Sequence, residues 1–271
     1  MDYIKSLISV YPQREARALY MLVMEVAFGM DSTQVLLGKD RELSAEKQAL
    51  LQNIIGRLVR KEPVQYILGQ ADFCGHTFLV EPGVLIPRPE TQELVRLINL
   101  HHPTPCSVLD IGTGSGCIAI SLALTGHQVT ALDVSPDALR IARKNACQLS
   151  ANVDFKEENI LHPSPTNQQW DVIVSNPPYI CQKEAEQMDK NVLDYEPHLA
   201  LFVPDDDPLV FYRAIALYAR EHLTQEGHLY FEINQAYPSE TATLLTRMGF
   251  SQVTVHPDIF EKPRFISAVK E

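Results

Sequence analysis

The sequence has little of what a secreted, zinc-binding or membrane protein needs. Its 271 residues include five cysteines, and no two of them form a Cys-x-x-Cys pair, which argues against a disulfide framework and against a zinc site. No apolar run reaches the roughly 20 residues of a membrane-spanning helix. The opening residues, Met1 to Lys5, lack the basic and apolar segments of a signal peptide. We therefore expect a cytoplasmic protein without membrane contact.

Basic side chains are scarce beyond residue 75. Residues 1–75 hold nine Lys or Arg and nine Asp or Glu, whereas residues 76–271 hold 14 basic and 25 acidic side chains, which accounts for the formal net charge of −11. An acidic surface repels nucleic-acid phosphates and suits a basic protein partner better, although solubility alone would also explain the excess. We expect no direct nucleic-acid binding.

The first 70 residues have the pattern of a small helical domain. Apolar side chains recur at helical spacing between Glu15 and Phe28, and Ser44 is suited to cap a second helix. Residues 72–80 predict a short hairpin that turns at Gly75, and prolines stiffen the chain after it. We therefore divide the chain into a helical domain at 1–70, a hairpin connection at 71–89 and an α/β domain at 90–271.

Strand and helix patterns alternate from residue 91 onward. Such alternation predicts a doubly wound, mostly parallel sheet, in which ligands bind at the carboxyl ends of the strands. The expected helices are 91–100, 117–124, 136–149, 208–222 and 237–248, and the expected strands are 107–111, 128–132, 153–155, 171–175, 227–234, 252–256 and 265–270. The stretch from 180 to 207 has the pattern of a long loop.

A glycine-rich turn follows the strand at 107–111. In Asp110-Ile111-Gly112-Thr113-Gly114-Ser115-Gly116 the glycines let the backbone approach a ligand closely, and the following helix offers free N–H groups at its start. Asp133 ends the next strand, where a carboxylate can accept both hydroxyls of a ribose. The glycine spacing differs from that of nicotinamide-binding proteins and resembles the first motif of class I methyltransferases that use S-adenosylmethionine.

A second turn, Asn176-Pro177-Pro178-Tyr179, closes the apolar strand at 171–175. Two consecutive prolines fix the backbone and supply no N–H donors, so carbonyl groups can point outward from a stiff turn. The side-chain oxygen of Asn176 and the carbonyl of Pro177 can accept the two hydrogens of a flat amino group, while Tyr179 stacks on its plane. A plain proline-rich turn is the alternative, and the glycine turn upstream favours the binding site.

Three runs of sequence resemble the HemK/PrmC family of protein-(glutamine-N5) methyltransferases, and the resemblance extends over nearly the whole chain. The runs are Glu62-Pro63-Val64-Gln65-Tyr66-Ile67-Leu68-Gly69, Val84-Leu85-Ile86-Pro87-Arg88-Pro89-Glu90-Thr91 and Asn176-Pro177-Pro178-Tyr179-Ile180. The resemblance implies transfer of a methyl group from S-adenosyl-L-methionine to N5 of the glutamine in the Gly-Gly-Gln motif of class 1 peptide chain release factors. It also implies that the helical domain recognises this substrate.

The resemblance further assigns individual residues. Asn176, Pro177 and Tyr179 are expected to be catalytic through positioning, and Asn176, Pro177, Pro178 and Tyr179 to bind the substrate glutamine. The expected cofactor-binding residues are Gly112, Thr113, Gly114, Ser115, Gly116, Asp133, Asn159, Ile160 and Asn176. Asn159 stands where the family commonly has an Asp. The reaction needs no metal, and we expect none.

Other functions share parts of this pattern. Amino-methyltransferases of nucleic-acid bases use the same Asn-Pro-Pro-Tyr motif for a flipped base, but the acidic residues 76–271 count against them. Methylation of a glutamine in a ribosomal protein would need the same chemistry. A nucleotide-binding scaffold without activity would retain the glycine turn and have no use for Asn176 and Tyr179. We expect the release factor enzyme, acting as a monomer.

Overall fold

The computed structural model describes residues 3–271, except the side chain of Gln187, and divides the chain into two compact units. The first unit holds Met1–Gln70 together with Asp189–Tyr195, and the second holds Ala71–Met188 and Glu196–Glu271. Asp189–Tyr195, which was expected within the α/β domain, groups with the helices of the first unit instead.

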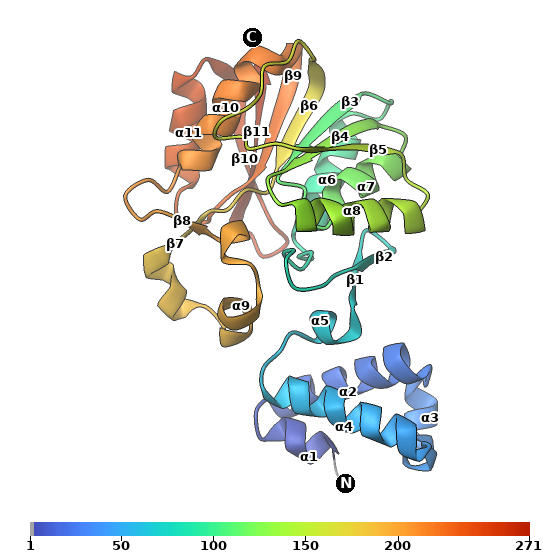
Figure 1. The fold of residues 1–271 in the computed structure, drawn as a ribbon. Coiled ribbons are helices and arrows are strands. Elements are labelled where there is room, and N and C mark those ends of the chain that lie inside the picture. The colour runs from blue at the N-terminus through green and yellow to red at the C-terminus, as the bar shows by residue number, and fades with distance from the viewer. Residues whose placement is uncertain (1–2) are drawn as a thin grey trace. The chain divides into compact units, whose positions relative to one another are not determined.

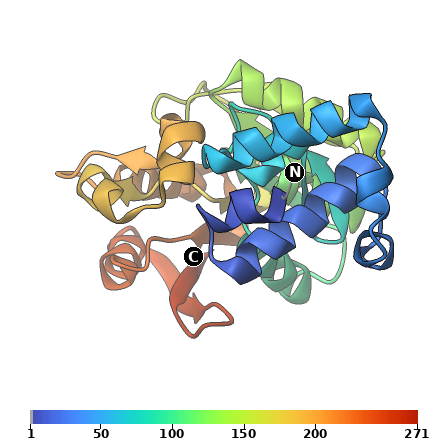
Figure 2. The same ribbon diagram turned by 90° about the horizontal axis from the view of Figure 1, so that it is seen from below.

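The first unit is a bundle of short helices around one apolar core. Its elements are α1 (Tyr3–Ile8), α2 (Gln13–Phe28), α3 (Ser32–Leu36), η1 (Lys39–Glu42), α4 (Ala45–Val59), α5 (Val64–Leu68) and α9 (Lys190–Tyr195). Leu7, Tyr20, Met24 and Leu58 are all buried there, and α2 lies alongside α4 (Figure 2).

Local signals in the sequence set the ends of these helices. Gly29 ends α2 in the left-handed conformation, which glycine adopts at little cost. The side chain of Asp31 accepts the backbone N–H of Gln34 at 2.8 Å and so caps α3. Within this unit the Tyr195 hydroxyl donates to the Arg60 carbonyl over 3.1 Å, which attaches α9 to the residue that follows α4.

The second unit contains a seven-stranded sheet in the order β10-β11-β9-β6-β3-β4-β5 (Figure 1). Neighbours are parallel from β5 through β9, whereas β11 is antiparallel to both β9 and β10. This arrangement confirms the predicted doubly wound, mostly parallel sheet. The strands are β3 (Ser107–Ile111), β4 (Gln128–Asp133), β5 (Val153–Glu157), β6 (Trp170–Ser175), β9 (Leu223–Glu232), β10 (Phe250–Pro257) and β11 (Pro263–Lys270).

Helices cover both faces of this sheet, which is why its central strands are apolar on both sides. On one face lie α6 (Thr91–His101), α7 (Cys117–Leu124) and α8 (Pro136–Gln148), and on the other lie α10 (Val210–His222) and α11 (Pro238–Arg247) (Figure 1). Val172 and Val174 of β6 belong to the first core, and Ile173 between them belongs to the second. This alternation follows from the two-residue period of a strand.

A hairpin of β1 (Gln70–Phe73) and β2 (His76–Leu79) leads into the second unit. Its Phe73 and Phe78 side chains are buried in the core beneath α6 and α7. The buried Asn145 of α8 exchanges hydrogen bonds with the Leu79 backbone at 2.7 and 3.0 Å and also donates to the Ser115 carbonyl at 2.9 Å. One side chain therefore ties the hairpin to the glycine turn.

The expected loop at 180–207 contains more regular structure than its sequence suggested. It includes β7 (Ile180–Cys181), η2 (Gln182–Gln187), α9, η3 (His198–Ala200) and β8 (Phe202–Val203), and β7 pairs with β8 in parallel. Strands of two residues show no periodicity, so the pattern could not reveal them. Strand β9 also begins at Leu223, before the expected residue 227. Its pairing with β6 shifts register between Trp170 and Val172.

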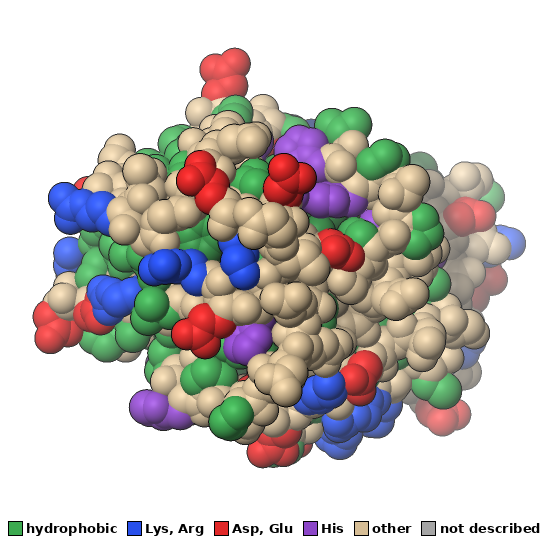
Figure 3. Space-filling model, turned by 90° about the horizontal axis from the view of Figure 1, so that it is seen from above, with side chains coloured by type: hydrophobic (Ala, Val, Ile, Leu, Met, Phe, Trp, Pro, Cys, Tyr) green, Lys and Arg blue, Asp and Glu red, His purple; other side chains and the backbone are tan. Residues whose placement is uncertain are grey.

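The amino-terminal edge of the sheet carries a group of histidines. His101 and His102, at the end of α6, both lie within hydrogen-bonding distance of the Tyr230 hydroxyl, and His228 lies 4.7 Å from His102 between ring centroids. Burial and the neighbouring histidines lower the pKa of His102 to about 4. Figure 3 shows histidines gathered on the face drawn there, where acidic and basic side chains are interspersed.

Candidate active site

A cavity of about 300 Å³ lies at the carboxyl ends of four parallel strands. Strand β3 has β4 on one side and β6 on the other, so the chain reverses its winding direction at this point. Such a switch point is where ligands bind in open α/β sheets. The lining includes Gly112 and Gly114 after β3, Asp133 to Ser135 at the end of β4, Glu158 to Ile160 after β5 and Ser175 to Pro178 at the end of β6.

The glycine turn is shaped by hydrogen bonds to the neighbouring strand. The backbone N–H groups of Gly112 and Thr113 both donate to the Leu132 carbonyl, at 2.8 and 2.9 Å. A Cβ atom added to Gly112 or Gly114 would meet no heavy atom within 4 Å, so these residues present bare backbone to open space. Their positive φ angles of 75° and 56° are the second reason for glycine.

Three residues expected to bind the cofactor lie outside the cavity. Thr113 and Ser115 are buried, and neither they nor Gly116 lines the cavity. A Cβ on Gly116 would come within 2.9 Å of the Ile120 side chain and 3.1 Å of Ala142. This glycine is therefore required for close packing of α7 against α8.

Asp133 lines the cavity at the end of β4. One carboxylate oxygen accepts the N–H of Gly114 at 2.8 Å, and the other accepts that of Ser135 at 2.9 Å. Burial raises the pKa of Asp133, and these backbone donors oppose the rise. Each oxygen keeps a further acceptor site, because a carboxylate has about four lone-pair positions. The side chain can thus hold the glycine turn and accept two ligand hydroxyls.

Asp110 lies directly beneath this turn and is fully buried. One of its oxygens accepts the Thr113 hydroxyl at 2.7 Å, whereas the other has no hydrogen-bond partner, and neither has the buried hydroxyl of Ser115. Burial raises the pKa of Asp110 to about 7. A cationic ligand group beside the turn would stabilise its carboxylate.

Asn159 and Ile160, expected on the adenine side, both line the cavity. The Asn159 side chain is exposed, and its oxygen accepts the N–H of Leu161 at 3.0 Å in a local turn. The oxygen is thus engaged while the amide N–H₂ group remains available as a donor. Phe211 and Ile215 of α10 add apolar surface that sequence reasoning missed, because it lies far along the chain.

The residues Asn176 to Pro178 line the cavity beside the glycine turn, because Ser175 of β6 pairs with Ile111 of β3. The Ser175 hydroxyl donates to the Ile111 carbonyl at 2.6 Å and so joins the ends of β6 and β3. Tyr179, in contrast, does not line the cavity. Its hydroxyl donates to the buried Glu232 carboxylate at 3.1 Å, and burial followed by the charge of Glu232 raises the pKa of the phenol.

Charged residues of the second sequence run form internal contacts. Arg88 pairs with the buried Glu196 at 2.6 Å, and the other Glu196 oxygen accepts the N–H of Ile86 at 3.1 Å. The Thr91 hydroxyl donates to Glu232 at 2.6 Å. No role was predicted for Glu232, although its position at the end of a strand was an available signal.

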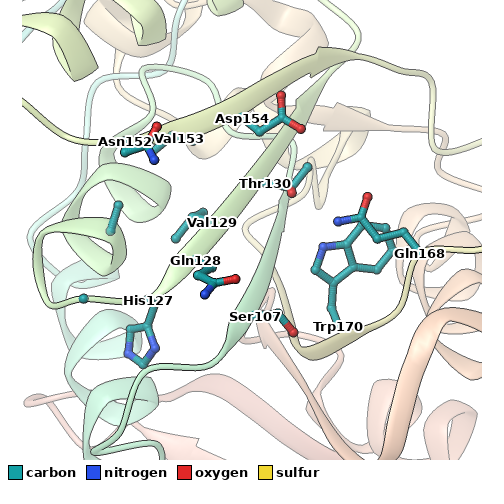
Figure 4. Close-up of a pocket in the computed structure, with 12 residues that line it drawn as sticks. Ser107, His127, Gln128, Val129, Thr130, Asn152, Val153, Asp154, Gln168 and Trp170 are labelled. Carbon is teal, nitrogen blue, oxygen red and sulfur yellow. The ribbon is translucent and has the colours of Figure 1, made fainter.

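A larger cavity, of about 670 Å³, lies at the opposite edge of the sheet. It is bordered by the first residues of several strands, including Ser107, Gln128 and Trp170 (Figure 4). Ligands of such sheets bind at the carboxyl ends of the strands, and this groove contains neither a glycine turn nor a carboxylate placed like Asp133. Size alone does not make it the reaction site.

The cavity at the carboxyl edge fits S-adenosylmethionine by its own chemistry. Bare glycine backbone leaves room for a ligand chain, Asp133 has acceptor sites left for ribose hydroxyls, and Ile160 with Val134 supplies apolar surface for a base.

Metal clusters and membrane spans are both absent from the described part of the chain. In residues 3–271, no group of three or more His, Cys, Asp or Glu side chains is arranged to hold a metal ion. Across the same residues, no helix has the length and apolar character needed to traverse a membrane.

Comparison with known proteins covers both units. Residues 5–69 match the family model described as PrmC N-terminal domain, and residues 90–194 match the methyltransferase small domain. A release factor glutamine methyltransferase of Bacteroides thetaiotaomicron is 51% identical over 267 residues, which span 97% of this chain and 96% of that relative. The enzyme of the same name from Flavobacterium psychrophilum is 41% identical over 272 residues, with 98% and 95% covered.

A solved structure gives an independent comparison of the fold. A methyltransferase from Pyrococcus furiosus matches with a TM-score of 0.54 at 16% sequence identity, covering 84% of this chain and 99% of that one. At this identity the likeness shows the fold alone, and it agrees with the methyltransferase sheet described above.

Proposed function

Because the chain belongs to the HemK/PrmC family of release factor glutamine methyltransferases, we propose that it methylates a glutamine of class 1 peptide chain release factors. The acceptor in this proposal is the side-chain amide nitrogen, N5, of the glutamine in the Gly-Gly-Gln loop. The observation that carries it is the meeting of two neighbouring turns in one cavity: Gly112 and Gly114, together with Asp133, and Asn176 to Pro178.

Each set of residues has a distinct task. Gly112, Gly114 and Asp133 would hold S-adenosylmethionine, with Asn159 and Ile160 on its adenine side. The bound cofactor would supply an activated methyl group on a sulfonium.

The chain's own contribution is chiefly alignment. An amide nitrogen is a weak nucleophile because its lone pair is delocalised into the carbonyl, so holding it at attack distance can remove much of the barrier. The Asn176 side-chain oxygen and the Pro177 carbonyl would accept its two hydrogens. These hydrogen bonds strengthen as positive charge develops on nitrogen, which favours the transition state over the bound substrate. The product nitrogen becomes acidic enough to lose its proton without a dedicated base.

We assign the recognition of the folded release factor to the first unit. A single glutamine side chain offers too little area for selection among proteins, so a protein substrate needs a second contact. Residues 5–69 match a domain model named for this family, and their sequence contains neither a glycine-rich loop nor a cluster of polar groups suited to a second active site. The excess of acidic side chains in residues 76–271 argues against a nucleic-acid base as the alternative substrate.

Mass spectrometry of the product tests the proposal. Incubation of a class 1 release factor with the protein and S-adenosylmethionine should add the mass of one methyl group to the glutamine of the Gly-Gly-Gln loop. A release factor carrying Asn in place of that glutamine is the matched control and should remain unmodified. Methylation of a ribosomal protein or of adenine, with none on the release factor, would replace this function with one of its alternatives.

A further inference from the structure

The buried carboxylate of Glu232 joins two segments that are distant in the sequence. Glu232 is the last residue of β9 and is 2% exposed. One of its oxygens accepts the hydroxyl of Thr91, the first residue of α6, at 2.6 Å. The other accepts the hydroxyl of Tyr179 at 3.1 Å. Both oxygens are thus occupied by hydroxyl donors, one from a helix start and one from the Asn-Pro-Pro-Tyr turn.

The end of β9 holds Tyr179 at two points. The Tyr179 carbonyl accepts the side-chain N–H of Asn234 at 2.9 Å, while its hydroxyl reaches Glu232. Ser175, the residue before Asn176, pairs with Phe231 of β9, so the turn begins beside this strand end. Because two prolines stiffen the segment between Asn176 and Tyr179, a fixed Tyr179 restricts where the Asn176 and Pro177 oxygens can point.

The electrostatics agree with a carboxylate that accepts and a phenol that donates. Burial raises the pKa of Glu232, whereas the Thr91 hydroxyl and the nearby Arg264 lower it. Burial and Glu232 raise the pKa of Tyr179, which keeps the phenol protonated. Arg264 is held in turn by the side chain of Asp258 at 3.2 Å. Satisfied polar networks of this kind fix geometry, and a missing member leaves its neighbours unpaired.

We propose that Glu232 is a positioning residue for methyl transfer: with Thr91 as its anchor, it holds Tyr179 and thereby sets the two oxygen acceptors of the Asn176–Pro177 pair. This assignment rests on the proposed function and adds a residue to its machinery. It also accounts for Thr91, the last residue of the second sequence run, which has no contact with the cavity. Glu232 itself does not line the cavity, so it acts through Tyr179.

Kinetics of single and double variants test this role. Glu232→Gln and Tyr179→Phe should each lower kcat on release factor by about tenfold or more, because small misplacements of positioning groups are costly. Affinity for S-adenosylmethionine, measured by calorimetry, should stay within about twofold. Since both variants alter the same hydrogen bond, the one between the Tyr179 hydroxyl and the side chain at 232, the double variant should lose no more than about twofold beyond the stronger single variant. Thr91→Val should be impaired, and Thr91→Ser, which keeps the hydroxyl, should be close to the unchanged protein.

Amide hydrogen exchange provides a readout that needs no substrate. The Ile180 N–H donates to the Leu201 carbonyl at 2.9 Å, so its exchange reports the order of the segment after the turn. Glu232→Gln should speed exchange at Ile180. The exchange result stands apart from the proposed function, because it is obtained whether or not release factor is the substrate.

A comparable carboxylate at the other edge of the sheet supplies the matched control. Asp171, at the start of β6, accepts the hydroxyls of Ser107 and Thr224 at 2.7 and 3.2 Å. Asp171→Asn should lower the melting temperature while leaving kcat and exchange at Ile180 nearly unchanged. The inference is overturned if Glu232→Gln, like Asp171→Asn, leaves kcat and exchange at Ile180 nearly unchanged. It is also overturned if the kcat of the double variant falls by the product of the two single losses, or if the affinity for S-adenosylmethionine falls as much as kcat.

Discussion

Replacing Asp133 with alanine tests the cofactor side of the cavity most directly. The change removes the two carboxylate oxygens that we propose accept the ribose hydroxyls, and hydrogen bonds to a charged group contribute about 1.5–3 kcal/mol each. Two bonds to one carboxylate do not add fully, so we expect binding of S-adenosylmethionine to weaken by about 2–4 kcal/mol, or roughly 30- to 700-fold in Kd. Isothermal titration calorimetry measures this Kd for the original protein and for Asp133→Ala.

The same substitution should have a second effect that the sequence did not reveal. Asp133 also accepts the backbone N–H groups of Gly114 and Ser135, at 2.8 and 2.9 Å. Losing a carboxylate that satisfies two backbone donors should destabilise the fold by about 1–3 kcal/mol. Asp133→Asn keeps one oxygen, so its Kd should lie between those of the original protein and of Asp133→Ala. Thermal unfolding without ligand separates the two effects.

Glu157 offers the matched control for this measurement. It ends β5, pairs with Asp133 across the sheet, is exposed and does not line the cavity. Glu157→Ala removes one negative charge from the same edge and should leave Kd within about twofold, since exposed charges interact weakly through water. Unchanged affinity in Asp133→Ala, or an equal loss in Glu157→Ala, would refute the assignment of Asp133 to the ribose.

Three further changes have distinct expected results. Asn176→Ala should lower turnover by about 10² or more while cofactor affinity changes only a few fold, because a positioned acceptor is lost; near-normal turnover would contradict its role. Folding raises the pKa of Asp110 to about 7, so the folded state binds this proton more tightly and the contribution of Asp110 to stability is lost as the pH rises from about 4 to about 7. Asp110→Asn should therefore melt several degrees above the unchanged protein at pH 8, with a smaller difference at pH 5, and equal differences would exclude a titrating Asp110. A chain lacking residues 1–70 should keep its cofactor affinity and its activity on a short Gly-Gly-Gln peptide but show a KM for intact release factor raised by about tenfold or more, whereas an unchanged KM would remove the recognition role of the first unit.

The central elements of the fold could be predicted because their patterns are local. The apolar run at 171–175 and the alternation of strands and helices were sufficient for a parallel sheet, and parallel strands bring their carboxyl ends to one edge. The order of the motifs along the chain was therefore enough to place Asp133 and Asn176 near the glycine turn. Helix ends marked by Gly29 and Ser44 were equally readable, since capping depends on side chains within a few residues.

Elements without a local signal were missed. Strands β7 and β8 have two residues each, and their pairing joins positions 22 residues apart, such as Ile180 with Phe202. Nothing near Asp189–Tyr195 in sequence indicates that this segment packs with the first unit, where Tyr195 contacts Arg60. The packing role of Gly116 was missed for the same reason, because Ala142, which it contacts, belongs to a helix that begins 20 residues later.

The sequence by itself determined the class of sheet and placed the glycine turn and the Asn-Pro-Pro-Tyr turn at the carboxyl ends of their strands, since each depends on a short run of residues and on strand direction. Only the tertiary structure decided which buried side chains support that turn. Glu232 meets Thr91 across 141 positions and Tyr179 across 53. Elsewhere in the same unit, Arg88 meets Glu196 across 108 positions. Such pairs leave no periodic pattern in the sequence, because packing of the whole sheet and its helices brings them together. Their hydrogen bonds are strong because the groups are buried, and burial is known only from the folded structure.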